Sequence, residues 1–142
     1  MSTPTDSLTV QLPLRVLVVD DNHDAAESMA VLLGLLGSKV RTCHDGIEAV
    51  RAFGEFLPQV VLLDIGLPKL DGHAAARQIR SQPGGDSVIL IALSGYGRDE
   101  DRQRSREAGF NHHIVKPVAP DTLINLLSTA VGSEGSKQSA TL

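Results

Sequence analysis

Three carboxylates follow two apolar runs of the sequence. Asp20 and Asp21 come directly after the run 16–19, and Asp64 ends a second run of valine and leucine residues. Apolar runs without polar alternation are typical of strands that are covered on both faces of a parallel sheet. If the two strands are neighbours, the carboxylates meet at the carboxyl edge of the sheet and repel each other. Mg²⁺ prefers oxygen ligands and would remove this repulsion, with the carbonyl oxygen of Gly66 as a further ligand.

A hydroxyl and an ammonium follow two further apolar runs. Ser94 lies near the end of VILIALSG, residues 88–95, and Lys116 follows HHIV, residues 112–115. Together with metal-bound carboxylates, these groups can surround a tetrahedral dianion with positive charge and a hydrogen-bond donor. Taken singly, each acidic residue is more typical of an ordinary helix cap or loop, and Ser94 and Lys116 also fit a turn residue and an ordinary ion-pair partner. All five lie at strand ends and none lies inside a strand, which favours one common site.

The elements that position these residues alternate between strands and helices. We expect strands at 14–20, 39–44, 60–64, 88–95 and 112–115, and helices that end near residues 36, 57, 80, 108 and 131. Parallel strands need crossover helices, so the sequence predicts an α/β fold with a doubly wound (βα)5 sheet of strand order 2-1-3-4-5, as in flavodoxin. This order makes the first and third strands neighbours. The helix 99–108 has almost no apolar stripe, so we expect it to be weakly anchored.

The length and composition limit the function classes. A chain of 142 residues is typical of one domain, and its net charge of −4 does not indicate a nucleic-acid binder. The single Cys43 indicates a reducing compartment, and the sequence has neither a transmembrane run nor a signal peptide. We therefore expect a cytoplasmic protein with no membrane partner. Its predicted parts are a flexible lead-in (1–13), a domain (14–131) and a disordered tail (132–142).

These residues and their order resemble the receiver domain of bacterial two-component response regulators, the family of the chemotaxis protein CheY. The resemblance spans about residues 14–131 and rests on five groups: Asp20-Asp21, Asp64 with Pro68, Asp71-Gly72, Ser94-Gly95 and Lys116-Pro117. It implies a Mg²⁺-dependent signalling domain that assists its own phosphorylation and dephosphorylation and is not a classical enzyme. The implied partners are a sensor histidine kinase or a histidine phosphotransfer protein, and a downstream protein that binds the face 99–131.

The resemblance also implies a role for each site residue. Asp64 would accept the phosphoryl group, Asp21 would bind Mg²⁺ directly, and Asp20 would bind it through water or act as a base. Ser94 would be the switch hydroxyl, and Lys116 would hold the phosphate before a cis peptide bond to Pro117. Receivers usually carry Tyr or Phe three residues before this lysine, as a ring that swings inward.

The chain departs from the family pattern at that position, where it has His113. Since imidazole titrates near neutrality, a switch that uses His113 would depend on pH. A purely steric role of the same flat ring is an equally open alternative.

Other readings of the sequence are less well supported. A haloacid-dehalogenase type hydrolase that uses Asp64 as its nucleophile would need a second aspartate where the chain has Gly66. Neither glycine-rich nucleotide-binding motif is present. His23, His44 and His73 fall in separate elements, so a histidine metal site is not indicated. A receiver-like interaction module that works without phosphorylation remains the nearest alternative, and the sequence leaves open a free-standing regulator or part of a hybrid kinase, as a monomer or weak dimer.

Overall fold

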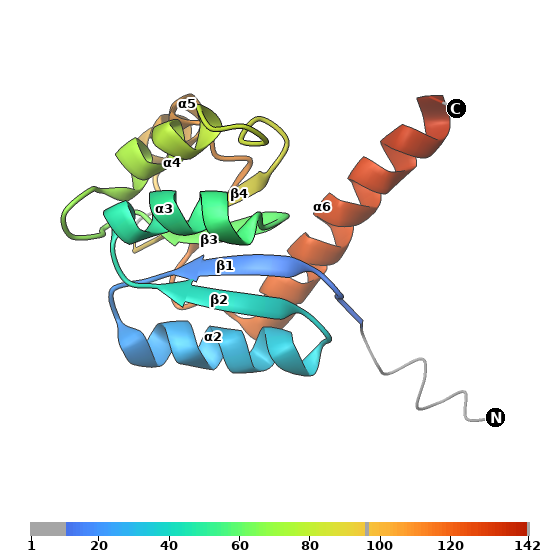
Figure 1. The fold of residues 1–142 in the computed structure, drawn as a ribbon, viewed down its shortest axis with the longest axis horizontal. Helices are drawn as coiled ribbons and strands as arrows, with labels where there is room; N and C mark the ends of the chain where they lie inside the picture. The colour runs from blue at the N-terminus through green and yellow to red at the C-terminus, as the bar shows by residue number, and fades with distance from the viewer. Residues whose placement is uncertain (1–10, 96, 142) are drawn as a thin grey trace.

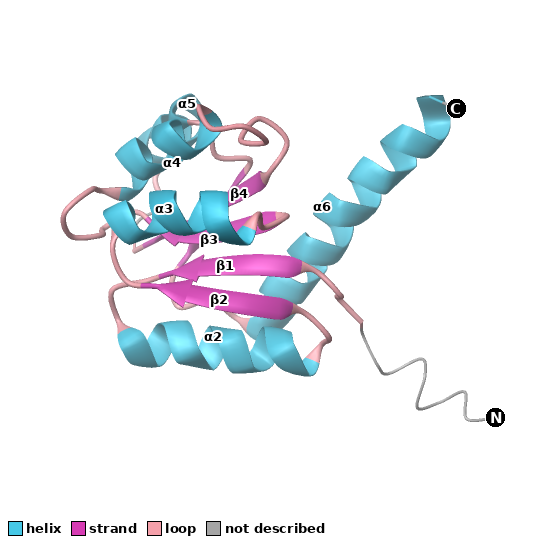
Figure 2. Ribbon diagram, in the orientation of Figure 1, coloured by secondary structure: helices cyan, strands magenta, loops and turns pink. Residues whose placement is uncertain are grey.

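The five strands form one parallel sheet in the predicted order. The structure is a computed structural model that describes residues 11–95 and 97–141, with side chains described up to Ala130. The sheet order is β2-β1-β3-β4-β5 (Figure 1; Figure 2). The strands are β1 (Arg15–Val19), β2 (Lys39–Cys43), β3 (Val60–Asp64), β4 (Ile89–Ser94) and β5 (His112–Val115). All four neighbouring pairs are parallel, which confirms the predicted fold class.

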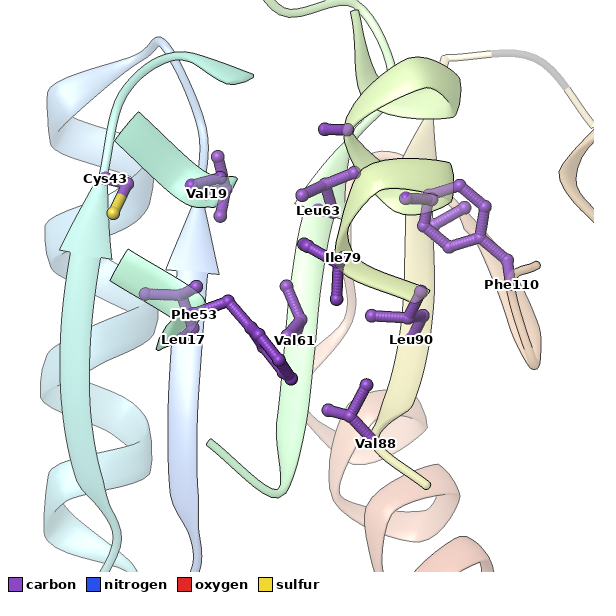
Figure 3. Packing of buried hydrophobic residues seen from close by; sticks show 14 of the residues in the cluster. Leu17, Val19, Cys43, Phe53, Val61, Leu63, Ile79, Val88, Leu90 and Phe110 are labelled. Carbon is purple, nitrogen blue, oxygen red and sulfur yellow. The ribbon is translucent and has the colours of Figure 1, made fainter. Parts of the chain in front are cut away.

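Helices cover both faces of the sheet. Their bounds are α2 (His23–Leu35), α3 (Gly46–Phe56), α4 (Gly72–Arg80), α5 (Asp99–Ala108) and α6 (Pro120–Thr141). Buried residues of α3, α4 and α5 pack on one face and those of α2 and α6 on the other. Neighbouring strand residues point to opposite faces, so Val61 and Leu63 contact α3 and α4 while Leu62 lies on the other side (Figure 3). The predicted central strands are therefore covered on both faces.

Polar side chains begin three of the helices that follow the strands. Asn22, Asp45 and Asp71 each accept a hydrogen bond from the backbone N–H three residues further on. Such caps satisfy N–H groups that lack a partner within the helix. Asn22, and not the preceding Asp21, is the cap of α2.

The small residues of α4 bring this helix close to the loop after β3. A Cβ atom at Gly72 would lie 2.6 Å from the Cα of Ile65, which only glycine avoids. Ala75, Ala76 and Ile79 continue the buried face of α4. The close packing fixes the start of the loop that follows Asp64, the last residue of β3.

The structure corrects two predicted boundaries. Leu12 is buried and its N–H donates to the carbonyl of Leu36, so residues 11–13 pack against the domain instead of forming a flexible lead-in. Residues 1–10 lie outside the described residues. The helix α6 continues to Thr141 and extends past the sheet, beyond the helix end near Val131 that was predicted, and the tail 132–142 as a separate part stays a prediction (Figure 1). Apolar periodicity reports which part of a helix packs, and Ala130 is the last buried residue among the described side chains of α6.

None of the helices within residues 11–95 and 97–141 is both long and apolar enough to cross a bilayer.

Candidate phosphoryl and metal site

The carboxylates of the predicted site meet at the carboxyl edge of β1 and β3. These strands are neighbours with Val19 beside Leu63, so the next residues, Asp20 and Asp64, also lie side by side. Both are buried, with 4% and 8% of their surface exposed, whereas Asp21 is exposed. One ligand atom from each of the three carboxylates lies within 4.8 Å of the others. The strand order alone therefore brings the three acids together.

In each of the two buried carboxylates, one oxygen accepts a hydrogen bond from a backbone N–H group and the other accepts from Lys116. Oδ1 of Asp64 accepts from the N–H of Gly66 at 3.0 Å, and Oδ1 of Asp20 accepts from the N–H of Asn22 at 3.0 Å. The Lys116 Nζ atom donates to Oδ2 of Asp64 at 2.9 Å and to Oδ2 of Asp20 at 3.3 Å. Each carboxylate is thus oriented by the chain on one side and neutralised by the lysine on the other.

Burial disfavours the charged form of one carboxylate of the site, that of Asp20. Burial raises the pKa of Asp20; the Asn22 N–H and the charge of Lys116 oppose this shift, and the charge of Asp64 adds to it. Burial alone would lower the pKa of Lys116, but the hydrogen bond and charge of Asp64, with a smaller effect of Asp20, outweigh it and raise the pKa. The ammonium therefore stays charged, and further positive charge at Asp20 would be favourable.

The donor set fits a hard divalent cation. Three carboxylate oxygens at short mutual distances, with Asp21 open to water, are the ligands that Mg²⁺ takes while keeping part of its hydration shell. Among the described residues, no other group of three His, Cys, Asp or Glu side chains meets this distance criterion. The triad can therefore bind a metal, and the role of the Gly66 carbonyl stays a prediction.

Ser94 and Lys116 reach the same edge of the sheet. Ser94 ends β4 next to β3 and is 8% exposed, and its carbonyl accepts from the N–H of Lys116 at 2.7 Å. The peptide bond between Lys116 and Pro117 is cis. A Cβ atom at Gly95 would meet no atom within 4 Å, so the chain after Ser94 borders open space. The structure thus brings all five predicted side chains to one edge.

His113 lies in β5, on the route from the site to α5. Its Nδ1 atom is 3.1 Å from Oγ of Ser105, which is 1% exposed, and either atom can donate depending on the tautomer. The sequence did not predict this bond, because Ser105 was read as part of a fully polar helix. In the structure Ser105 and Ala108 are buried, so α5 does have a narrow face toward the sheet.

Two histidines flank the site in a way that the sequence reading missed. Nδ1 of His44 lies 3.0 Å from the carbonyl oxygen of Asp20, and its ring stacks on that of His23 with centroids 3.7 Å apart. The predicted strand order already implied the contact with Asp20, because β1 and β2 are neighbours and Asp20 and His44 directly follow their ends. His44 thus supports the backbone of Asp20.

A groove of about 620 Å³ opens beside the carboxylates. Asp20, Asn22 and Lys116 lie at its polar end, and apolar side chains of α2 and α6, among them Met29 and Leu123, line the remainder. A partner that reaches Asp64 can therefore find apolar contacts next to the charged site.

A parallel five-stranded sheet with acidic residues and a lysine at its carboxyl edge is the arrangement of CheY-like receivers. Residues 16–128 match the family described as response regulator receiver domain. The chain belongs to this family of two-component signalling domains and is a receiver domain, not a classical enzyme. Receiver domains partner with histidine kinases.

Similar proteins agree with this assignment. Response regulator MprA of Mycobacterium sp. (strain KMS) is 34% identical over 113 residues, which are 80% of this chain and 48% of that protein. The chain thus spans about half the length of this relative. The receiver domain of sensor histidine kinase PA1611 from Pseudomonas aeruginosa PAO1 has a TM-score of 0.78 and 34% identity, with 85% of this chain and 99% of that chain covered. That crystal structure has a magnesium ion coordinated in the active site cleft.

Chemotaxis protein CheY4 of Vibrio cholerae has the same fold. Its crystal structure gives a TM-score of 0.79 at 25% identity, and the match covers 83% of this chain and 98% of that chain. The match thus covers nearly all of this solved chain but about half of MprA, and the architecture around the present domain is left to proposal.

Proposed function

We propose that Asp64 accepts a phosphoryl group from a phosphohistidine in a Mg²⁺-dependent reaction. The observation that carries this proposal is the position of Asp64, buried between the ammonium of Lys116 at 2.9 Å and the carboxylates of Asp20 and Asp21. An oxygen of Asp64 would form the new bond to phosphorus while the bond between phosphorus and the donor nitrogen breaks. The departing imidazole keeps the electron pair of that bond and takes up a proton.

The chain's own groups would position the reactants. A carboxylate attacks a phosphoryl group poorly because both are anionic, so catalysis depends on positive charge and orientation. Mg²⁺ held by Asp21, Asp64 and Gly66, with Asp20 binding through water or acting as a base, would supply charge. Lys116 would move from the carboxylate to the phosphoryl oxygens, and the Gly66 N–H would keep Asp64 oriented.

The output is proposed to run from Ser94 and His113 to the face formed by α5, β5 and α6. A new phosphoryl group would attract the Ser94 hydroxyl, and the chain after Ser94 leads directly into α5. The Ser105–His113 contact supports a further connection, because it joins β5 to α5. A local change of charge would in this way reach a surface that a downstream protein can bind.

The partners and surroundings of the domain are proposals as well. A sensor histidine kinase or a histidine phosphotransfer protein would donate the phosphoryl group, with the groove beside Asp20 and Lys116 as its contact surface. The domain would be either a free-standing regulator or the receiver part of a hybrid kinase. We propose residues 14–131 as the domain, and the buried side chain of Leu12 packs against it.

Phosphoramidate labelling tests the function directly. We expect one added phosphoryl group per chain by intact-mass measurement, dependent on Mg²⁺ and absent in Asp64→Asn. Asp86→Asn is the matched control, because Asp86 is an exposed aspartate in the turn after α4. Labelling of Asp64→Asn at the wild-type level would exclude Asp64 as the acceptor. A wild-type chain that takes up no phosphoryl group would instead favour a phosphorylation-independent interaction module.

A further inference from the structure

The peptide bond between Asp20 and Asp21 joins two acids of the site, and a side chain that follows β2 contacts its carbonyl oxygen. The Asp20 N–H donates to the carbonyl of Cys43 at 3.0 Å, where the pairing of β1 with β2 ends. The carbonyl oxygen of Asp20 then lies 3.0 Å from Nδ1 of His44, the residue after β2. Because a carbonyl oxygen only accepts, Nδ1 carries the proton and donates the hydrogen bond. His44 therefore fixes the orientation of the peptide group that leads into Asp21.

Asp20 is held through its backbone as well as through its carboxylate. Its four hydrogen-bonding groups contact four different residues: the N–H contacts Cys43, the carbonyl contacts His44, Oδ1 contacts Asn22 and Oδ2 contacts Lys116. The contact with His44 acts directly on the peptide group that Asp20 shares with Asp21. Since the side chain of Asp21 is exposed, the direction in which it points depends on this backbone more than on packing.

His44 is itself held by two neighbouring helices. Its ring stacks on that of His23, the first residue of α2, with centroids 3.7 Å apart and planes 13° apart. Its backbone N–H donates to Oε1 of Glu48 at 2.7 Å, and the N–H of Glu48 donates to Oδ1 of Asp45 at 2.8 Å. These two bonds close the start of α3 in the manner of a capping box. The Nδ1 donor is thus fixed in place before any ligand arrives, so little order has to be gained on binding.

We propose that His44 is a positioning residue for the divalent cation, because its bond to the Asp20 carbonyl sets the direction of the Asp21 carboxylate. The inference rests on the proposed function only in taking the acidic triad as the metal site. Among the described residues, the side chains close enough to share an ion are Asp20, Asp21 and Asp64, so His44 acts through these acids and not as a ligand. Loss of its Nδ1 donor frees the peptide group to rotate and lowers the fraction of chains in which Asp21 faces the other two carboxylates.

Metal binding by the full chain at one fixed pH tests the role of His44. The probe is Mn²⁺, which takes the same oxygen ligands as Mg²⁺ and whose unbound form is counted by electron paramagnetic resonance. Added Mg²⁺ then competes for the site. His44→Phe keeps a flat ring against His23 and removes the donor. His44→Asn removes the ring and keeps an N–H donor at the position of Nδ1.

The two variants should differ in metal affinity. We expect His44→Phe to weaken Mn²⁺ binding about fivefold, the ratio that corresponds to one hydrogen bond, and His44→Asn to regain most of this loss. The backbone amide resonance of Asp21 in the metal-free chain should move in His44→Phe and move less in His44→Asn. His112→Phe, at the first residue of β5 and so at the opposite edge of the sheet, is the matched control and should bind as wild type does.

Three results would overturn the proposal: wild-type affinity in His44→Phe, equal weakening by His44→Phe and His44→Asn, or no binding of Mn²⁺ by the wild-type chain. Weakening by His112→Phe to the same extent would also count against it, since the effect would then not be specific to His44. Phosphoramidate labelling is read separately. A labelled chain whose metal affinity does not depend on His44 rejects this proposal alone, whereas the expected affinities in a chain that is not labelled support it and reject the proposed function.

Discussion

Replacing Lys116 by methionine tests whether its ammonium holds the buried carboxylates together. The side chains of Asp20 and Asp64 are 6% and 11% exposed, and that of Lys116 is 33% exposed. Removing one partner of a fully buried ion pair costs about 3–5 kcal/mol, whereas exposed pairs contribute about 0–1 kcal/mol. For this intermediate burial we expect Lys116→Met to lower the free energy of unfolding by about 2 kcal/mol at pH 7 without divalent cations.

Urea unfolding with and without Mg²⁺ measures this effect. Asp20→Asn is the matched control, because burial raises the pKa of Asp20 and the amide oxygen can still accept from the N–H of Asn22. Its neutralisation relieves repulsion from Asp64, so we expect its free energy of unfolding to change by less than about 1 kcal/mol. Mg²⁺ should stabilise Lys116→Met more than wild type, since the carboxylates then lack the ammonium.

Two results would refute the electrostatic reasoning. A loss below about 0.5 kcal/mol for Lys116→Met would place the site in the class of solvent-screened surface pairs. An undiminished loss when Asp20→Asn and Asp64→Asn are already present would show that the lysine stabilises the fold through its alkyl chain and not through these acids.

Three further predictions concern residues outside the site. The Arg80 guanidinium donates five hydrogen bonds, two to the carbonyl of Gly109 and one each to the carbonyls of Gly85 and Val88 and to the side chain of Asn111. Arg80→Lys should therefore lower the free energy of unfolding, measured by urea unfolding, by about 2 kcal/mol. Arg77→Lys, at an exposed position of the same helix, is the control and should change this free energy little. Leu57 ends α3 with φ of 53° and is 63% exposed, so Leu57→Gly should raise the free energy of unfolding by about 0.5–1 kcal/mol, and a loss would contradict this. Burial raises the pKa of Cys43 to about 12, so iodoacetamide at pH 8 should label the thiol only in unfolding concentrations of urea. Rapid labelling without urea would show that the core around Cys43 opens in the folded protein.

The sequence predicted the features that depend on strand order and periodicity. Unbroken apolar runs identified β1, β3 and β4, and the order of alternating elements then placed Asp20 beside Asp64. The small buried residues of α4, which are visible in the sequence, account for its close approach to the sheet. These features follow from local patterns and a few topological rules, which is why they could be read without coordinates.

Contacts between side chains from distant elements could not be predicted in this way. The strand order places His44 near Asp20, but the stacking of His44 on His23, the first residue of α2, also depends on the rotamers of both side chains. The hydrogen bonds of Arg80 reach a loop and a helix end 29 residues away, and no spacing in the sequence marks an arginine that binds carbonyl groups. The buried Leu12 was missed because the segment 1–13 was classed as a lead-in from its Ser, Thr and Pro content, although Leu8, Val10 and Leu12 alternate with polar residues.

The helix α5 is anchored at one end more firmly than its sequence predicted, and this affects how the proposed switch would move it. Its polar sequence indicated weak packing along the whole helix, but the structure holds its C-terminal half through the buried Ser105 and through Arg80, which donates to the carbonyl of Gly109. At the other end Arg98 provides no side-chain cap. The less anchored end is the one that the chain after Ser94 enters. In the proposed switch, a movement of Ser94 would reach α5 at this end, and the Ser105–His113 contact lies near the opposite end, which Arg80 holds.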